Sequence, residues 1–210
     1  MGAMAPQQAK PLELFRQTMR QPAIVCDIDG VLAFLAEAVF TALNATFGTM
    51  YDAHKVKTYW VEGLLPKAQS EWLTHWLDNP WSYVNLVPDQ QAISAINKMH
   101  EAGLHITIAT DRQVSVQGIT GQWLDRWGVK YNDLKVGRGN KEALANQHGP
   151  ERPMILFDDS PERIPTIPRP GVQLDMPLRP WSPPLAVAGE IENVTVFDDW
   201  RKILIALGLS

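Results

Sequence analysis

Three short apolar runs, over residues 23–27, 104–110 and 154–157, are separated by longer stretches of mixed character. A proline or a glycine directly precedes each run, and the runs lead to Asp27, to Thr110 and to the pair Asp158-Asp159. Runs of this length with such boundaries are typical of strands that are buried on both faces of a sheet. We therefore predict strands in these three places, and further strands at residues 172–174 and 194–197.

Helical periodicity fills the stretches between these strands. Apolar residues recur three and four positions apart over residues 92–99, after Asp89, which can cap a helix, and before Gly103, which can end one. Similar patterns predict helices over residues 11–20, 116–127, 141–147 and 200–207. Alternating strands and helices are joined by right-handed crossovers, which make the strands parallel. We predict an α/β fold, a Rossmann-like parallel sheet flanked by helices, with reactive groups at the carboxyl ends of the strands.

Two segments do not fit this alternation. Residues 34–87 contain ten of the 18 aromatic residues and have a mostly helical pattern, but they are too long for a simple crossover. We interpret them as a small helical cap domain inserted after the first strand, which leaves residues 1–33 and 88–210 for the core domain. Residues 161–184 contain eight of the 16 prolines and are predicted to form an ordered, irregular loop around the strand at 172–174.

Composition narrows the class of protein. The 210 residues are enough for one domain with an insert, and 45% hydrophobic against 20% charged residues indicate a buried core. The net charge of −4 argues against a nucleic-acid coat protein or a polybasic membrane binder, and a single cysteine, Cys26, excludes a disulfide framework. The chain has no apolar run of about 18 residues and no signal-peptide pattern, so we expect a soluble, cytoplasmic protein without a membrane partner. The oligomeric state stays open, a homodimer included.

Two pairs of carboxylates follow predicted strands. The segment Asp27-Ile-Asp29-Gly30-Val31 comes after the first strand, and Asp158-Asp159 comes after a later one. A single Asp-x-Asp is usually a turn or a solvated pair, but four carboxylates at one edge of a sheet would repel each other. A hard cation with oxygen ligands, above all Mg²⁺, offsets that repulsion. Lys141 and the hydroxyl of Thr110 could complete an anion site, with Lys135 as a rival of Lys141.

The ordered set of Asp27-x-Asp29-Gly-Val, Thr110, Lys141 and Asp158-Asp159 resembles the haloacid dehalogenase superfamily of phosphotransferases over nearly the whole chain. The resemblance implies that Asp27 is the nucleophile, which forms an aspartyl-phosphate, and that Asp29 is the general acid and base. It also implies that Thr110 and Lys141 hold the phosphoryl group, while backbone N–H groups near Gly30 face it.

A magnesium ion is the cofactor that this resemblance implies. Its ligands would be the carboxylate of Asp27, the backbone carbonyl of Asp29, and Asp158, with Asp159 in support. Phosphoryl transfer needs positioning and charge neutralisation, which such a set provides. A receiver domain of two-component signalling also combines acidic residues, Thr and Lys with Mg²⁺. Its phosphorylated Asp lies in the middle of the sheet, however, and this chain has no matching residue there.

Within the superfamily, the chain looks most like the 5'(3')-deoxyribonucleotidases. The points of likeness are residues 29–33, the helical cap, the turn at residues 81–88, residues 157–161 and Asp199-Trp200. This likeness implies a Mg²⁺-dependent phosphomonoester hydrolase acting on nucleoside monophosphates, and aromatic cap residues suit stacking on a nucleobase. The candidate substrate-binding residues are Phe34, Trp60, Trp81, Tyr83 and Arg112.

Two alternatives stay open. Arg112, followed by residues 120–124, resembles the 3'-phosphatase domain of polynucleotide kinases, which would make the end of a DNA or RNA strand the substrate. The acidic net charge and the large predicted cap favour the small substrate. A non-catalytic binding module with the same fold is the other alternative, against which the intact set Asp27, Asp29, Lys141 and Asp158 argues.

Overall fold

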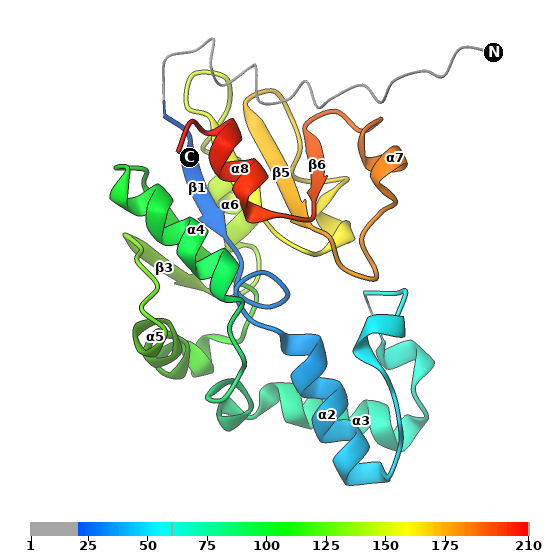
Figure 1. The fold of residues 1–210 in the computed structure, drawn as a ribbon. Helices are drawn as coiled ribbons and strands as arrows, with labels where there is room; N and C mark the ends of the chain where they lie inside the picture. The colour runs from blue at the N-terminus through cyan, green and yellow to red at the C-terminus, as the bar shows by residue number, and fades with distance from the viewer. Residues whose placement is uncertain (1–20, 60, 210) are drawn as a thin grey trace, which may run out of the picture.

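The computed structural model describes residues 21–59 and 61–209, and its centre is a six-stranded sheet in which neighbouring strands are parallel (Figure 1). The strand order is β3-β2-β1-β4-β5-β6. The strands are β1 (Ala23–Cys26), β2 (Ile106–Thr110), β3 (Asp133–Val136), β4 (Met154–Phe157), β5 (Val172–Pro177) and β6 (Val194–Phe197). The α/β fold class predicted from the sequence is confirmed.

Helices cover both faces of the sheet, as the alternating pattern requires. These helices are α4 (Gln90–Glu101), α5 (Gln117–Arg126), α6 (Asn140–Ala145), α7 (Leu185–Ala188) and α8 (Trp200–Ala206). Two other helices, α2 (Leu35–Phe47) and α3 (Lys67–Asp78), belong to the segment between β1 and α4. Ile24 and Cys26 of β1 pack with α4, α5 and α8, whereas Val25 packs in a separate cluster with α6 and α7. This alternation follows from the strand geometry, in which successive side chains point to opposite faces.

The helix predicted after Asp89 is confirmed as α4. The Asp89 carboxylate accepts hydrogen bonds from the backbone N–H groups of Gln91 and Ala92, both at 3.1 Å. These groups have no partner inside the helix, so the cap satisfies two of the donors that a helix start leaves free.

One strand was not predicted. β3 lies at the edge of the sheet, and its sequence, Asp-Leu-Lys-Val, alternates exposed charged residues with less exposed apolar ones. Charged side chains are common on edge strands, where they discourage pairing with other chains, but they remove the apolar run by which a central strand is recognised. The strand predicted at 172–174 extends further, to Pro177.

The segment between β1 and α4 lies below the sheet in Figure 1, where α2 and α3 run beside each other. It has its own small apolar cluster, centred on Phe40, Leu43 and Ala53. The two ends of this segment lie side by side, since Phe34 N donates to Val87 O at 2.9 Å. The helix predicted at 11–20 and the candidate Trp60 lie outside the described residues.

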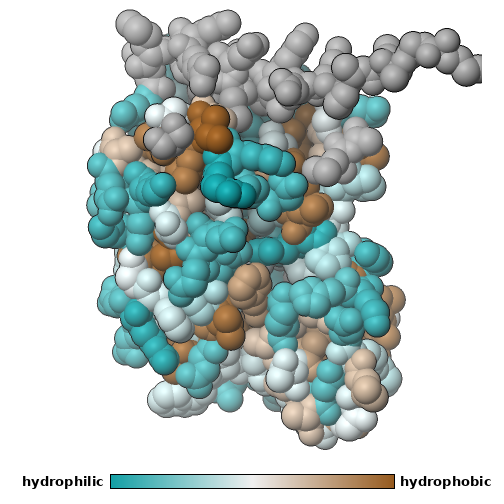
Figure 2. Space-filling view, in the orientation of Figure 1, coloured by the Kyte–Doolittle hydropathy of each residue, from teal (hydrophilic) through white to brown (hydrophobic). Residues whose placement is uncertain are grey.

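The surface seen in Figure 2 is mostly hydrophilic over the core, and hydrophobic side chains show as separate patches between the polar ones. Among the described helices, none is long and apolar enough to cross a membrane.

Candidate active site

Two acidic loops meet at the carboxyl edge of the sheet. Strand β1 pairs with β4, and the ladder continues past their ends, where Asp27 N donates to Phe157 O at 2.9 Å. Asp27, Asp158 and Asp159 are all buried, and each offers one carboxylate oxygen within 4.8 Å of the others. The register of two parallel strands thus brings together carboxylates that are more than 130 positions apart in the sequence.

Lys141 lies between two of these carboxylates. Its Nζ is 2.7 Å from Asp27 Oδ2 and 2.7 Å from Asp158 Oδ2, and its side chain is 1% exposed. Burial opposes the charge of Lys141, but Asp158 and Asp27 prevail and raise its pKa. The rival, Lys135, lies exposed on β3, on the far side of β2 from this cluster.

The cluster needs more positive charge than Lys141 provides. Burial raises the pKa of Asp27 to about 7, although Lys141 acts in the opposite direction. Burial and the neighbouring Asp158 raise the pKa of Asp159 well above its ordinary value, and Asp159 Oδ1 is buried without a hydrogen-bond partner. An all-oxygen donor set with an unpartnered carboxylate oxygen suits Mg²⁺, so the residues present fit the cation that the sequence predicted.

Gly30 allows the two acidic loops to touch. Its φ is +75°, and a Cβ atom at this position would lie 1.9 Å from Asp159 Oδ2. Glycine is therefore required here twice, for the left-handed backbone and for the space that the Asp159 carboxylate occupies.

Asp29 stands apart from the cluster, in an ion pair with Arg112. Arg112 Nε donates to Asp29 Oδ2 at 2.8 Å and Nη2 donates to Oδ1 at 2.6 Å, a bidentate arrangement. The guanidinium is itself fixed, because it lies 4.3 Å from the ring centre of Tyr83 and donates to Thr120 Oγ1 at 3.3 Å. The carboxylate of Asp29 is thus held at a defined place beside the cluster.

A second arginine, Arg163, contacts Asp158. Its Nε is 3.3 Å from Asp158 Oδ2, and its terminal nitrogens contact the carboxylates of Asp111 and Glu142. Thr110, at the end of β2, is buried, and its hydroxyl accepts from Arg112 N at 3.4 Å. Thr110 therefore lies at the same edge of the sheet as the acidic loops.

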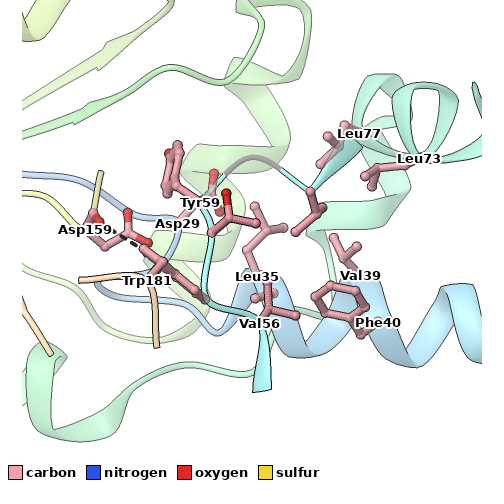
Figure 3. Close-up of a pocket in the computed structure, with 14 residues that line it drawn as sticks. Asp29, Leu35, Val39, Phe40, Val56, Tyr59, Leu73, Leu77, Asp159 and Trp181 are labelled. Atoms are coloured by element: carbon pink, nitrogen blue, oxygen red, sulfur yellow. Dashed lines mark hydrogen bonds between the residues drawn. The ribbon is translucent and has the colours of Figure 1, made fainter. Parts of the chain in front are cut away.

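A cavity opens between α2, α3 and the acidic loops (Figure 3). Asp29, Gly30 and Asp159 form its polar end, while Leu35, Val39 and Phe40 of α2 and Leu73 and Leu77 of α3 form its apolar end. Tyr59 and Trp181 lie beside the carboxylates, with ring centres 6.4 Å apart. Among the described residues that line this cavity, the carboxylates are Asp29 and Asp159.

The structure places the three predicted aromatic residues that it describes, Phe34, Trp81 and Tyr83, apart from this cavity. Phe34 lines a second cavity, where its ring centre is 5.5 Å from the guanidinium carbon of Arg179. Tyr83 is buried against Arg112, and Trp81 is 73% exposed and lines neither cavity. Trp181 was not predicted; the available signal was a tryptophan in the proline-rich loop that follows β5, between Pro180 and Pro183.

The fold is shared with solved structures of haloacid dehalogenase-type hydrolases. A haloacid dehalogenase-like hydrolase from Streptococcus pneumoniae has a TM-score of 0.62 at 13% identity, covering 88% of this chain and 97% of its own. A haloacid dehalogenase-family hydrolase from Deinococcus radiodurans, with bound phosphate and sodium, has a TM-score of 0.58 at 17% identity, over 89% and 96%. An L-2-haloacid dehalogenase has a TM-score of 0.55 at 12% identity, over 91% and 100%. Neither a family model nor a curated protein matches the sequence.

At these identities the likeness is one of fold. The chain therefore has the fold of haloacid dehalogenase-type hydrolases, with a buried cluster of three aspartates at the carboxyl edge of the sheet.

Proposed function

We propose that the protein is a Mg²⁺-dependent phosphomonoester hydrolase in which Asp27 is the nucleophile. The observation that carries this proposal is the buried cluster of Asp27, Asp158 and Asp159, with Lys141 Nζ at 2.7 Å from two of the three carboxylates. Arg163, which contacts Asp158 Oδ2 at 3.3 Å, is shared with the carboxylates of Asp111 and Glu142, so Lys141 and Arg163 together leave negative charge that a divalent metal would neutralise. The metal would in turn neutralise charge on a bound phosphate.

In the first step, an oxygen of Asp27 attacks the phosphorus atom, and the bond from phosphorus to the ester oxygen breaks. Asp29 starts this step protonated and gives its proton to the leaving alcohol, which departs into the cavity; the carboxylate that forms is the one that Arg112 binds through both oxygens. Lys141, the Thr110 hydroxyl and backbone N–H groups near Gly30 hold the phosphoryl oxygens. In the second step, Asp29 takes a proton from a water molecule that attacks the aspartyl-phosphate, which frees Asp27 and inorganic phosphate.

Asp29 has a position suited to this double role. Its carboxylate lines the cavity that would receive the leaving group, and Arg112 holds it beside Asp27 without joining it to the cluster. Displacement of a halide from carbon would need neither a proton donor for the leaving group nor a cation on the electrophile. These features therefore favour phosphoryl transfer over dehalogenation.

As substrate we propose a small phosphate ester, a nucleoside monophosphate. The segment 34–87 would be the cap over this substrate, because α2 and α3 form the far wall of the cavity. A cavity bounded by helices on one side and acidic loops on the other suits a small molecule better than the end of a nucleic-acid strand. Arg112, on which the resemblance to a nucleic-acid 3'-phosphatase was based, is buried in its ion pair with Asp29.

The test is phosphate release from a panel of phosphate esters, with Mg²⁺ and with EDTA. We expect hydrolysis that requires Mg²⁺ and falls by at least about 1,000-fold in Asp27→Asn, since the nucleophile is lost. Asp125→Asn, an exposed carboxylate on α5, is the matched control and should retain full activity. Full activity of Asp27→Asn would end the proposal.

Two further arms separate the alternatives. An end-labelled oligonucleotide that loses its 3'-phosphate faster than any mononucleotide would favour the nucleic-acid substrate. Phosphate binding without turnover of any ester would favour a non-catalytic binding module. Detection of phosphate on the peptide that contains Asp27, after acid quenching, would identify the intermediate.

A further inference from the structure

Resting on the proposed phosphatase function, we propose that Trp181 is the specificity residue of the cavity, and that the cavity selects monophosphate esters whose leaving group carries an uncharged aromatic ring. The ring would stack on the indole of Trp181 and extend into the apolar end of the cavity. A nucleobase would accordingly be recognised by its face and not by its hydrogen-bonding edge.

The backbone that carries Trp181 is stiff. Residues 178–184 follow β5 and include Pro180, Pro183 and Pro184, each of which fixes one backbone dihedral. Ser182 closes a turn around the tryptophan, since Ser182 N donates to Arg179 O at 3.0 Å and Arg179 N donates to Ser182 Oγ at 2.9 Å. A residue on such a loop loses little conformational entropy when it binds a ligand.

The same loop is attached to both acidic loops. Trp181 Nε1 donates to the backbone carbonyl of Asp159 at 3.2 Å, and Arg179 Nε donates to the backbone carbonyl of Gly30 at 2.7 Å. The indole is therefore held at a fixed distance from the carboxylates that would act on the phosphate. Because its only polar atom is already bonded, what the indole offers to the cavity is an apolar face.

The lining of the cavity defines what can stack there. Tyr59 contacts Trp181 edge to face, with the ring planes inclined by 65°, and both rings line the cavity next to the carboxylates (Figure 3). Among the described lining residues there is no Lys, Arg or His to bind a second phosphate, and no Asn or Gln to pair with the edge of a base through two hydrogen bonds; the uncharged polar side chains there are those of Thr58 and Tyr59. The charged lining residues, Asp29 and Asp159, are acidic and would repel a second phosphate.

The test compares esters that share a sugar and differ in the ring. The four 2'-deoxynucleoside 5'-monophosphates are measured against 2-deoxyribose 5-phosphate and against a deoxynucleoside 3',5'-bisphosphate. We expect the four bases to differ by less than about tenfold in kcat/KM, and the two other esters to be at least about tenfold poorer than any of them.

The decisive variant is Trp181→Ala. It should lower kcat/KM for the deoxynucleotides by about 10- to 100-fold and leave that for 2-deoxyribose 5-phosphate within about threefold. Trp181→Phe keeps a ring and should recover most of the loss, and Trp81→Ala, at an exposed tryptophan, should change neither substrate. Circular dichroism and the melting temperature verify that the variants fold.

An equal loss for both esters in Trp181→Ala, or no loss at all, would overturn the inference. So would a preference for one base by more than about 100-fold. A binding measurement separates the ring selectivity from the proposed hydrolysis. Calorimetry compares the binding of a deoxynucleotide and of 2-deoxyribose 5-phosphate to Asp27→Asn and to the double variant Asp27→Asn with Trp181→Ala. Ring-selective binding that depends on Trp181, in a protein that hydrolyses neither ester, would sustain the inference and refute the proposed reaction.

Discussion

Replacement of Arg112 tests whether the bidentate pair with Asp29 positions the proposed acid and base. The Arg112 side chain is 1% exposed and that of Asp29 is 18% exposed, with nitrogen–oxygen distances of 2.8 and 2.6 Å. Removing one partner of a buried ion pair costs about 3–5 kcal/mol, because the other charge stays without compensation. Asp29 faces the cavity, where water can solvate it, so we expect about 2–3 kcal/mol of lost stability in Arg112→Gln.

The effect on turnover should depend on the leaving group. A poor leaving group, such as an alkyl alcohol, needs the proton from Asp29, whereas a nitrophenolate departs without it. Because general acid catalysis contributes about 10²–10⁴-fold, Arg112→Gln should lower kcat for an alkyl phosphate by about 100-fold. The loss for 4-nitrophenyl phosphate should stay below about tenfold. Asp29→Asn should show the same contrast.

Two further variants test whether the effect comes from the paired donors of Arg112. Arg112→Lys keeps the charge but loses the fork of two parallel donors, so its kcat should lie between those of the wild type and Arg112→Gln. Arg126→Gln is the matched control, because Arg126 also lies over an aromatic ring, that of Trp127, but is exposed and has no carboxylate partner in the described residues. Equal losses for both esters, or wild-type turnover in Arg112→Gln, would refute the positioning of Asp29 by Arg112.

Three other changes test the surroundings of the site. Gly30→Ala places a Cβ atom 1.9 Å from Asp159 Oδ2, so it should lower the melting temperature and abolish turnover. The control, Gly121→Ala, lies inside α5 with open space around it and should stabilise the protein by about 0.5–1 kcal/mol in urea titrations. Wild-type stability and turnover in Gly30→Ala would contradict the close contact. In scanning calorimetry, Mg²⁺ should raise the melting temperature of the wild type more than that of Asp159→Asn. Equal increases in the two proteins would show that Asp159 is not part of the metal site. Burial raises the pKa of Asp175 to about 7, so the folded protein keeps a proton that the unfolded chain releases above about pH 4. This contribution to stability is complete below pH 4 and is lost as the pH rises to about 7. The free energy of unfolding of Asp175→Asn, measured relative to that of the wild type, should therefore be higher at pH 8 than at pH 4, by up to about 4 kcal/mol. Parallel pH profiles of stability in the two proteins would speak against this prediction.

The central strands and the acidic loops could be predicted from local pattern alone. A run such as 154–157 must be buried, and alternating helices make its neighbours parallel, so that Asp27 and Asp158 end at one edge of the sheet. Asp89 was recognisable as a helix cap for a similar reason, since its hydrogen bonds reach only two and three residues ahead. Edge strand β3 was not predicted, because its charged residues interrupt the apolar run by which strands are recognised.

The contacts that define the substrate space arise only in the folded chain. The pair of Arg112 with Asp29 spans 83 positions, and Trp181 meets the backbone of Asp159 across 22 positions through an irregular loop. The order of residue types along the chain identified the carboxylates and the candidate cations, because a strand end commits a side chain to one edge of the sheet. Which lysine enters the cluster, which carboxylate stays outside it and which aromatic ring faces the cavity depend on how separate loops pack, and no local spacing encodes that packing.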